Sequence, residues 1–276
     1  MTLLVVGNDR VDAGKTTFST GLVAATGAVG FKPRAGNDHW FHHDDYRESL
    51  SRGSLFGKDA RRLANASPGT LEPTDINPVH RLWQPAPGNG SGMLGQNDRE
   101  FLVDRAGEQY ILNGTAEIPE RVREQLSLSD ALVVDTIEEF NRVMQNYHLP
   151  ALDSLSRTIQ TTDRAVVESY SDVARPIQGL EPNGVAVVEP GRALIFAGSR
   201  FCKACEIASG TEGSFEGQLE ERVSSVLDLV DPETAVDLPA LPKEKRMEPG
   251  AVADAYAPAY DSLLETAGWN SLLSRP

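Results

Sequence analysis

The residues with the clearest chemical potential form one segment near the amino terminus, from Gly7 to Thr17. The segment reads GNDRVDAGKTT, close to the phosphate-binding pattern GxxxxGK[ST] but with its first glycine two residues further back. Around Gly14, backbone N–H groups can curl about phosphate oxygens at the positive end of a helix. The Lys15 ammonium would neutralise β- and γ-phosphate oxygens, and the Thr16 hydroxyl would bind Mg²⁺. The segment therefore predicts a nucleoside triphosphate site.

The segments on either side of this loop are those that a phosphate site requires. Thr2–Val6 is typical of a buried strand, Lys15–Ala25 has a helical pattern, and Ala28–Pro33 is a second short strand. Such a βαβ unit implies a parallel sheet. The alternative, an ordinary turn that happens to contain Gly-Lys-Thr, does not account for both flanking elements. The residues expected to contact nucleotide are Asn8, Asp9, Arg10, Asp12, Ala13, Gly14, Lys15, Thr16 and Thr17.

Later apolar runs and turn residues predict the rest of an α/β fold. Helical patterns cover Ile118–Leu126, Ile137–Tyr147, Leu152–Ile159, Phe215–Val230 and Ala251–Ala267. Strand patterns cover Arg164–Glu168, Val185–Val188, Ala193–Ala197 and Thr234–Leu238. Pro150 is expected to break the helical pattern around it. Together these elements predict one three-layer α/β/α domain with a parallel sheet over residues 1–276.

Residues 34–115 differ in composition from the rest of the chain, because they are polar and rich in Gly, Pro, Asn and His. Their many aromatic residues of the buried type are too numerous for a flexible tether. A hairpin is expected within them, formed by Glu100–Asp104 and Gln109–Asn113. The stretch is therefore interpreted as an elaborated insertion after the second strand, which offers a substrate or partner surface.

Two groups of residues in this insertion have their own chemical potential. The segment 38–45 contains His42 and His43 among carboxylates, but consecutive histidines rarely reach one metal ion from regular structure. Substrate contact is the preferred interpretation there. His80 and Arg81 are placed either on an anionic substrate or in an ordinary loop.

Composition restricts the function classes. The 276 residues include 40 Asp and Glu against 26 Lys and Arg, a net charge of −14 that disfavours a broad nucleic-acid surface. The acidic, lysine-poor composition resembles that of proteins from salt-loving archaea. Apolar runs fall short of the ~20 residues of a membrane span, and no signal peptide is evident, so a cytoplasmic protein is expected. Cys202 and Cys205 form a lone CxxC, interpreted as buried or incidental thiols.

The lengthened loop resembles that of dethiobiotin synthetase and the cobyrinate amidotransferase type, in the P-loop class that includes MinD-like ATPases. Phe31-Lys32-Pro33 is similar to the Lys-Pro after that family's second strand. Arg164–Glu168 is similar to its hydrophobic strand ending in Glu, and Val236–Pro242 to its loop near the nucleotide base. The resemblance covers residues 1–35 well and 150–245 loosely.

This resemblance implies a Mg²⁺-dependent enzyme that uses ATP to activate a small, unidentified acceptor, as a ligase or kinase does. Lys15, Lys32 and Glu168 would be catalytic, Thr16 and Glu168 would hold Mg²⁺, and Pro239 and Leu241 would lie near the base. From the residues alone, Glu168 is either a metal ligand or a surface residue at a strand end, and Asp172 is a weaker second candidate. The chain departs from the family at 168–172, which reads ESYSD and not EGAGG, and at Ser199-Arg200, where an asparagine is expected.

A second interpretation is a regulatory MinD-like ATPase or GTPase switch without an acceptor. Its best evidence is Arg10, which stands five residues before Lys15, where MinD-type ATPases have a lysine that crosses a dimer interface. A solvated loop residue explains Arg10 equally well. A third interpretation is a module that binds nucleotide without turnover. The chain has no Asn/Thr-Lys-x-Asp motif for guanine, which favours ATP, and the class allows a homodimer.

Overall fold

The computed structural model describes residues 1–8, 13–86, 99–211 and 221–269. The chain forms two compact units. The first unit contains Met1–Pro33, Arg62–Leu71 and Ser156–Pro276, and the second contains Arg34–Arg61 and Glu72–Leu155. The second unit thus holds most of the predicted insertion 34–115 and continues 40 residues beyond it, whereas Arg62–Leu71 belong to the first unit.

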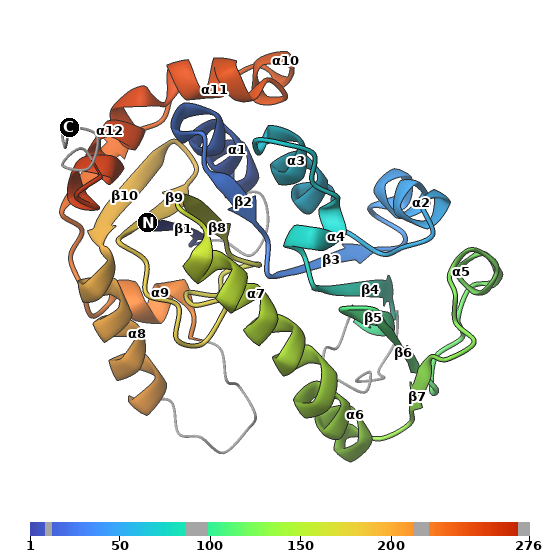
Figure 1. The fold of residues 1–276 in the computed structure, drawn as a ribbon. Helices are drawn as coiled ribbons and strands as arrows, with labels where there is room; N and C mark the ends of the chain where they lie inside the picture. The colour runs from blue at the N-terminus through green and yellow to red at the C-terminus, as the bar shows by residue number, and fades with distance from the viewer. Residues whose placement is uncertain (9–12, 87–98, 212–220, 270–276) are drawn as a thin grey trace. The chain divides into compact units, whose positions relative to one another are not determined.

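A six-stranded sheet forms the centre of the first unit in the part of the chain that the structure describes (Figure 1). Its strand order is β11-β10-β9-β1-β8-β2. The strands are β1 (Thr2–Gly7), β2 (Val29–Phe31), β8 (Ala165–Glu168), β9 (Gly184–Glu189), β10 (Arg192–Ala197) and β11 (Thr234–Asp237). The first four are mutually parallel, and β10 and β11 are each antiparallel to their neighbours.

The α/β class is therefore confirmed, but the prediction of an entirely parallel sheet is wrong for β10 and β11. The cause is the short connection Pro190-Gly191, which turns the chain straight back from β9 into β10. Gly191 has φ +85°, a left-handed conformation that a tight hairpin turn requires. A parallel neighbour would need a crossover of a dozen or more residues.

Helices cover both faces of this sheet (Figure 1). On one face lie α1 (Lys15–Thr26), α11 (Pro249–Ala255) and α12 (Ala257–Thr266), and on the other lies α8 (Gly198–Thr211), with α9 (Val223–Leu227) beside it. The β1 residues 3–6 are at most 1% exposed, as expected of a strand covered on both sides. The rings of Phe18 and Tyr260 meet edge to face at 4.9 Å, which joins α1 to α12.

The helical prediction for Phe215–Val230 is confirmed in part. Within the described residues, only Val223–Leu227 of this range is helical, and residues 212–220 lie outside them. The long helix is instead α8, which the sequence pattern did not indicate. Its sequence GSRFCKACEIASGT is rich in small residues and poor in strong helix formers, so its helix depends on packing against β9 and β10.

The second unit contains a five-stranded sheet, among described residues, in the order β3-β4-β5-β6-β7. The strands are β3 (Arg34–Asp38), β4 (Val79–Pro85), β5 (Arg99–Ala106), β6 (Gln109–Asn113) and β7 (Leu132–Val134). The predicted hairpin is confirmed as β5 and β6, which pair antiparallel with Val103 opposite Leu112. The outer strands β3 and β7 are each parallel to their neighbour.

The helices of the second unit pack around this sheet. They are α2 (His43–Ser51), α4 (Pro73–Ile76), α5 (Glu120–Gln125) and α6 (Ile137–Val143). Two further helices, α3 (Lys58–Ala66) and α7 (Leu149–Thr161), have residues in both units. The expected break at Pro150 does not occur, because one π-helical turn (Met144–His148) joins α6 to α7. The wide turn accommodates a proline, which has no N–H to donate.

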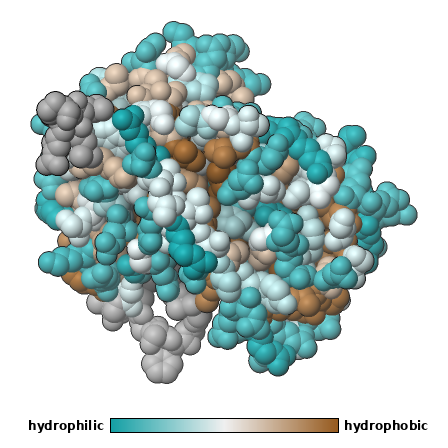
Figure 2. Space-filling model, viewed as in Figure 1, coloured by the Kyte–Doolittle hydropathy of each residue, from teal (hydrophilic) through white to brown (hydrophobic). Residues whose placement is uncertain are grey.

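Two features of composition are visible in the structure. No helix of the described ranges is both long enough and apolar enough to cross a membrane. The face shown in Figure 2 is mostly hydrophilic, in agreement with a chain of which 24% is charged.

Close packing of α1 against α11 and α12 depends on Gly21. A Cβ atom at this position would lie 2.4 Å from the Tyr260 hydroxyl and 2.6 Å from Val252 Cγ1. We expect Gly21→Ala to lower the free energy of unfolding by about 1–3 kcal/mol, because this core has no space for a methyl group. Gly250→Ala is the matched control, since a Cβ there meets no atom within 4 Å. Urea denaturation of both variants checks this, and equal stability of the two would contradict it.

Candidate active site at the carboxyl edge of the first sheet

The four parallel strands of the first unit end at one edge of the sheet. In open α/β sheets, ligands bind beyond this carboxyl edge. Here Gly7 ends β1, Glu168 ends β8, Glu189 ends β9, and Lys32 follows β2. Strand β11 runs in the same direction as β9, because each is antiparallel to β10, so residues 238–242 follow the same edge.

The described part of the loop between β1 and α1 has the backbone of a helix start. Gly14 has φ +88° and ψ 5°, and its carbonyl accepts the first helical hydrogen bond, from Phe18 at 3.0 Å. The Asn8 side chain donates to Glu189 Oε1 at 2.9 Å, which attaches the loop to β9. Ala13 is buried and Thr17 is half-buried. The predicted contact residues Asp9, Arg10 and Asp12 lie outside the described residues.

Lys15 folds back over the end of β1. Its ammonium donates to the Ser171 carbonyl oxygen at 2.7 Å, and the side chain is largely buried. A Cβ at Gly7 would lie 2.9 Å from both Lys15 Cδ and Lys15 Nζ, so glycine is required for this path. Ser171 has φ +52°, an unfavourable conformation for a residue with a side chain, and it aims the accepting carbonyl at the lysine.

Glu168 is the centre of a buried polar cluster. It is 0% exposed, and its Oε1 accepts from Thr16 Oγ1 at 2.8 Å and from Lys32 Nζ at 2.6 Å. Lys32 Nζ also donates to the Ser169 carbonyl at 2.8 Å. Among the described residues, Glu168 Oε2 is buried and has no hydrogen-bond partner. The structure thus brings four side chains from three segments to this edge: Lys15 and Thr16 from α1, Lys32 after β2 and Glu168 from β8.

The oxygen atoms of this cluster suit a Mg²⁺ ion. The Thr16 hydroxyl gives its proton to Glu168, so its lone pairs are free to face a cation. The second carboxylate oxygen of Glu168 is an orphaned buried acceptor. Hydroxyl and carboxylate oxygens are the donor types that Mg²⁺ prefers. Thr16 and Glu168 therefore fit the metal that the sequence predicts.

Lys32, which is predicted to be catalytic, lies in a buried environment. The residue is 2% exposed, and its ammonium forms an ion pair with Glu168. Because a lone buried carboxylate is costly, this ammonium compensates for the burial of Glu168 and fixes its orientation.

The segment after Glu168 contains the weaker candidate, Asp172. Arg222 forms an ion pair with this carboxylate, and Ser171 Oγ donates to it at 3.0 Å. Partial burial raises the pKa of Asp172, but a backbone hydrogen bond and Arg222 outweigh that effect and hold the pKa below its usual range. Asp172 is thus an anchor for the segment that carries Ser171. Sequence reasoning missed Ser171 and Arg222, since a backbone carbonyl and a distant arginine leave no motif.

The two residues proposed for an anionic substrate lie in the second unit, on strand β4 and not in a loop. His80 is fully buried; burial and the charge of Arg105 lower its pKa to about 3, so it is neutral and faces no solvent. Arg81 donates to both oxygens of buried Asp104, at 2.6 and 2.5 Å. Burial would raise the pKa of Asp104, but Arg81 lowers it to about 2. The substrate role of His80 is therefore wrong, and Arg81 has an internal partner.

The remaining candidates do not form a metal site. His42 Nδ1 accepts from the Asp38 N–H at 3.0 Å, and His43 Nδ1 lies 3.3 Å from the His39 carbonyl. Within the described ranges, no group of three His, Cys, Asp or Glu residues could hold an ion. Cys202 and Cys205 lie on α8 as free thiols, and burial raises the pKa of Cys205 to about 12. Both thiols are therefore poor nucleophiles.

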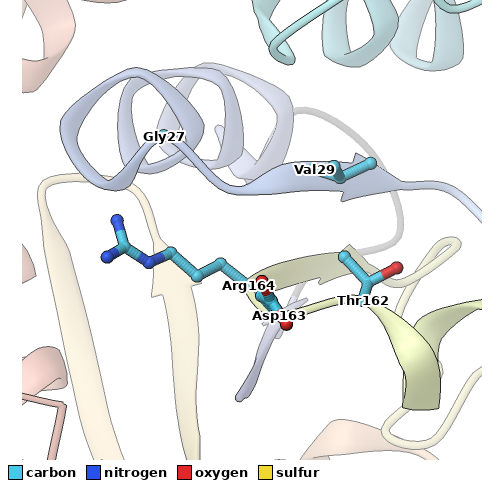
Figure 3. A pocket seen from close by; sticks show the side chains of 5 residues that line it. All are labelled: Gly27, Val29, Thr162, Asp163 and Arg164. Atoms are coloured by element: carbon cyan, nitrogen blue, oxygen red, sulfur yellow. The ribbon is translucent and has the colours of Figure 1, made fainter. Parts of the chain in front are cut away.

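One pocket of the first unit lies at the opposite edge of the sheet (Figure 3). It has a volume of about 430 Å³, and its lining residues are Gly27, Val29, Thr162, Asp163 and Arg164. These residues precede β8 or begin β2, so they lie at the amino ends of the strands. Arg164 Nη1 donates to the Thr26 carbonyl at 3.0 Å, which places a cation at the negative end of α1. This pocket is therefore not at the carboxyl edge that carries Lys15 and Glu168.

The predicted base contacts follow β11. The Leu238 N–H donates to the Gly191 carbonyl at 2.7 Å, which fixes the start of the segment beside the β9–β10 turn. Pro239 is exposed and Leu241 is half-buried, so both side chains are accessible at the carboxyl edge.

The buried Lys32–Glu168 pair generates a stability prediction. Lys32→Met should lower the free energy of unfolding by about 3–5 kcal/mol, because it leaves a buried carboxylate without its cation. The double variant Lys32→Met/Glu168→Gln should lose less than the sum of the two single losses. Urea denaturation measures all three, with Lys203→Met, at an exposed position of α8, as control. Additive losses would contradict the coupling.

Two comparisons, with protein-family models and with curated proteins, identify no relative of this chain. No protein-family model matches the chain, and no curated protein matches it either. The site therefore has to be interpreted from its own residues.

Proposed function

We propose that this protein is a Mg²⁺-dependent ATP-binding enzyme of the P-loop type, which hydrolyses ATP or transfers its γ-phosphoryl group to activate a small acceptor. One observation carries the proposal: Lys15 and Thr16 begin α1 directly after a left-handed glycine, and Thr16 contacts a buried carboxylate at the end of a neighbouring parallel strand. Ammonium, hydroxyl and carboxylate thereby lie at the edge where open α/β sheets bind ligands.

Several groups of the chain would bind a triphosphate, each in a different way. The first N–H groups of α1 lack helical acceptors and point toward the loop, where they can donate to phosphate oxygens. Lys15 exchanges the Ser171 carbonyl for the more negative phosphate oxygens. Thr16 and Glu168 hold Mg²⁺, which when bound would neutralise charge on the transferred group. Lys32 pairs with Glu168 and holds its carboxylate in place.

The choice of nucleotide and of reaction rests on weaker support. The chain has no Asn/Thr-Lys-x-Asp motif for guanine, which favours ATP over GTP. The chain has a second compact unit, which offers a surface for an acceptor. This favours an enzyme that uses an acceptor over a regulatory switch. Arg10, the residue that would favour a MinD-like switch, lies outside the described residues.

Lys15→Ala should reduce ATP turnover about 100-fold or more, because it removes a charge that faces the transferred phosphoryl group. Lys203→Ala, an exposed lysine of the same unit, should leave turnover unchanged. The measurement is phosphate release from ATP with Mg²⁺ in high salt, with circular dichroism to show that both variants are folded. Wild-type turnover in folded Lys15→Ala would remove the proposal.

The hydroxyl of Thr16 allows a separate test of the metal site. Thr16→Val keeps the shape of the side chain but removes the oxygen, so half-maximal turnover should require at least about tenfold more Mg²⁺, while Thr16→Ser should restore the wild-type requirement. Thr161→Val, an exposed threonine on α7, is the matched control. If Thr16→Val and wild type have the same Mg²⁺ dependence, Thr16 does not bind the metal.

A further inference from the structure

The second unit has a cleft of its own, which contains none of the residues at the carboxyl edge of the first unit's sheet. Its volume is about 460 Å³, within the range of small-molecule sites. All of its lining residues belong to the second unit, and they come from the β5–β6 hairpin, the turn after α2, helix α4 and the loop after α5. They are Gly53, Ser54, Thr74, Arg105, Gly107, Glu108, Gln109, Tyr110, Ser127, Ser129, Asp130 and Ala131.

Arg105 is a buried cation on the wall of this cleft, with 4% of its surface exposed. Its guanidinium donates to the backbone carbonyl oxygens of Leu55, Asn77, Pro78 and Gly107. These four bonds leave one of its five N–H groups, on Nη2, without an acceptor among the described residues. No carboxylate of the described chain forms an ion pair with it. Carbonyl dipoles solvate the charge but do not neutralise it.

The rest of the lining supplies neutral hydrogen-bonding groups. Ser54, Thr74, Ser127 and Ser129 each bring a hydroxyl to the cleft. None of these hydroxyls is bonded to another described side chain or backbone group, so they are available to a ligand. Glu108 and Asp130 also line the cleft, but both are exposed, where water weakens their charge. The charge of Glu108 still acts on Arg105 and raises its pKa, although burial lowers that pKa more. The most deeply buried charge of the cleft is therefore positive.

We propose that this cleft binds a small metabolite through an oxyanion group, a carboxylate or a phosphate. Arg105 supplies the charge, and the hydroxyls of Thr74 and Ser129 donate to the remaining oxygens. A guanidinium with hydroxyl donors is a common recognition set for both groups. Binding would complete the hydrogen bonding of Arg105 and neutralise a buried charge. The proposal is independent of the function proposed for the nucleotide edge.

The test is isothermal titration calorimetry on the full-length chain carrying Lys15→Ala, so that phosphate at the nucleotide loop does not contribute. Inorganic phosphate and malonate are titrated separately at low salt. We expect saturable binding of at least one probe with a Kd of about 1 mM or tighter. Binding of phosphate alone assigns the cleft to phosphorylated molecules, and binding of malonate alone assigns it to carboxylates.

Substitutions of the lining residues test whether the probes bind in this cleft. Thr74→Val/Ser129→Ala should weaken it about tenfold or more, as expected for lost hydrogen bonds to a charged group. Arg105→Lys should weaken it further if the variant folds by circular dichroism. The matched controls Arg47→Gln and Ser51→Ala are exposed residues of the same unit outside the cleft, and they should leave the Kd unchanged. Absence of saturable binding for both probes, or an unchanged Kd in Thr74→Val/Ser129→Ala, overturns the proposal.

Discussion

The charge of Glu168 is the constraint on which the arrangement of the first unit depends. A carboxylate with no exposed surface would be strongly destabilising alone, so the fold must bring donors to it from other segments. Thr16 comes from the first turn of α1, and Lys32 comes from the end of β2. Because β1, β8 and β2 are adjacent and parallel, their carboxyl ends meet at one edge, although Lys32 and Glu168 are 136 residues apart in the sequence. The position of this cluster therefore follows from the order of the strands in the sheet. That order depends in turn on the burial of the strands.

Backbone conformation is the second requirement of this edge. Gly7 leaves room for the Lys15 side chain, and Gly14 adopts the left-handed conformation that precedes α1. Ser171 adopts a left-handed conformation despite its side chain, and its carbonyl reaches the Lys15 ammonium. The anchoring of Asp172 by Arg222 compensates for that strain. The position of the Lys15 side chain thus depends on a distant part of the chain, which contributes Arg222.

The sequence predicted those elements of the structure that depend on short, local sequence patterns. The βαβ unit at the amino terminus, the strand ending in Glu168 and the β5–β6 hairpin each have a short pattern that determines them. Tertiary packing determines the elements that the sequence did not predict. The segment of small residues in α8 is helical because it packs against β9 and β10, and a π-helical turn continues the helix through Pro150. The convergence of Lys15, Thr16, Lys32 and Glu168 on one edge was predictable, but the pairing of Lys32 with Glu168 was not, since no spacing encodes it.

The net charge of the chain disfavours a broad nucleic-acid surface, yet it does not exclude local sites for anions. Exposed charges more than about 10 Å apart are largely screened at 0.1 M salt, so the net charge of −14 has little effect inside a cleft. What matters there is the partner of each buried cation. Lys32 and Arg81 pair with the buried carboxylates Glu168 and Asp104, and these pairs are internally neutral. Arg105 is held by carbonyl oxygens instead, so its positive charge persists for an incoming oxyanion.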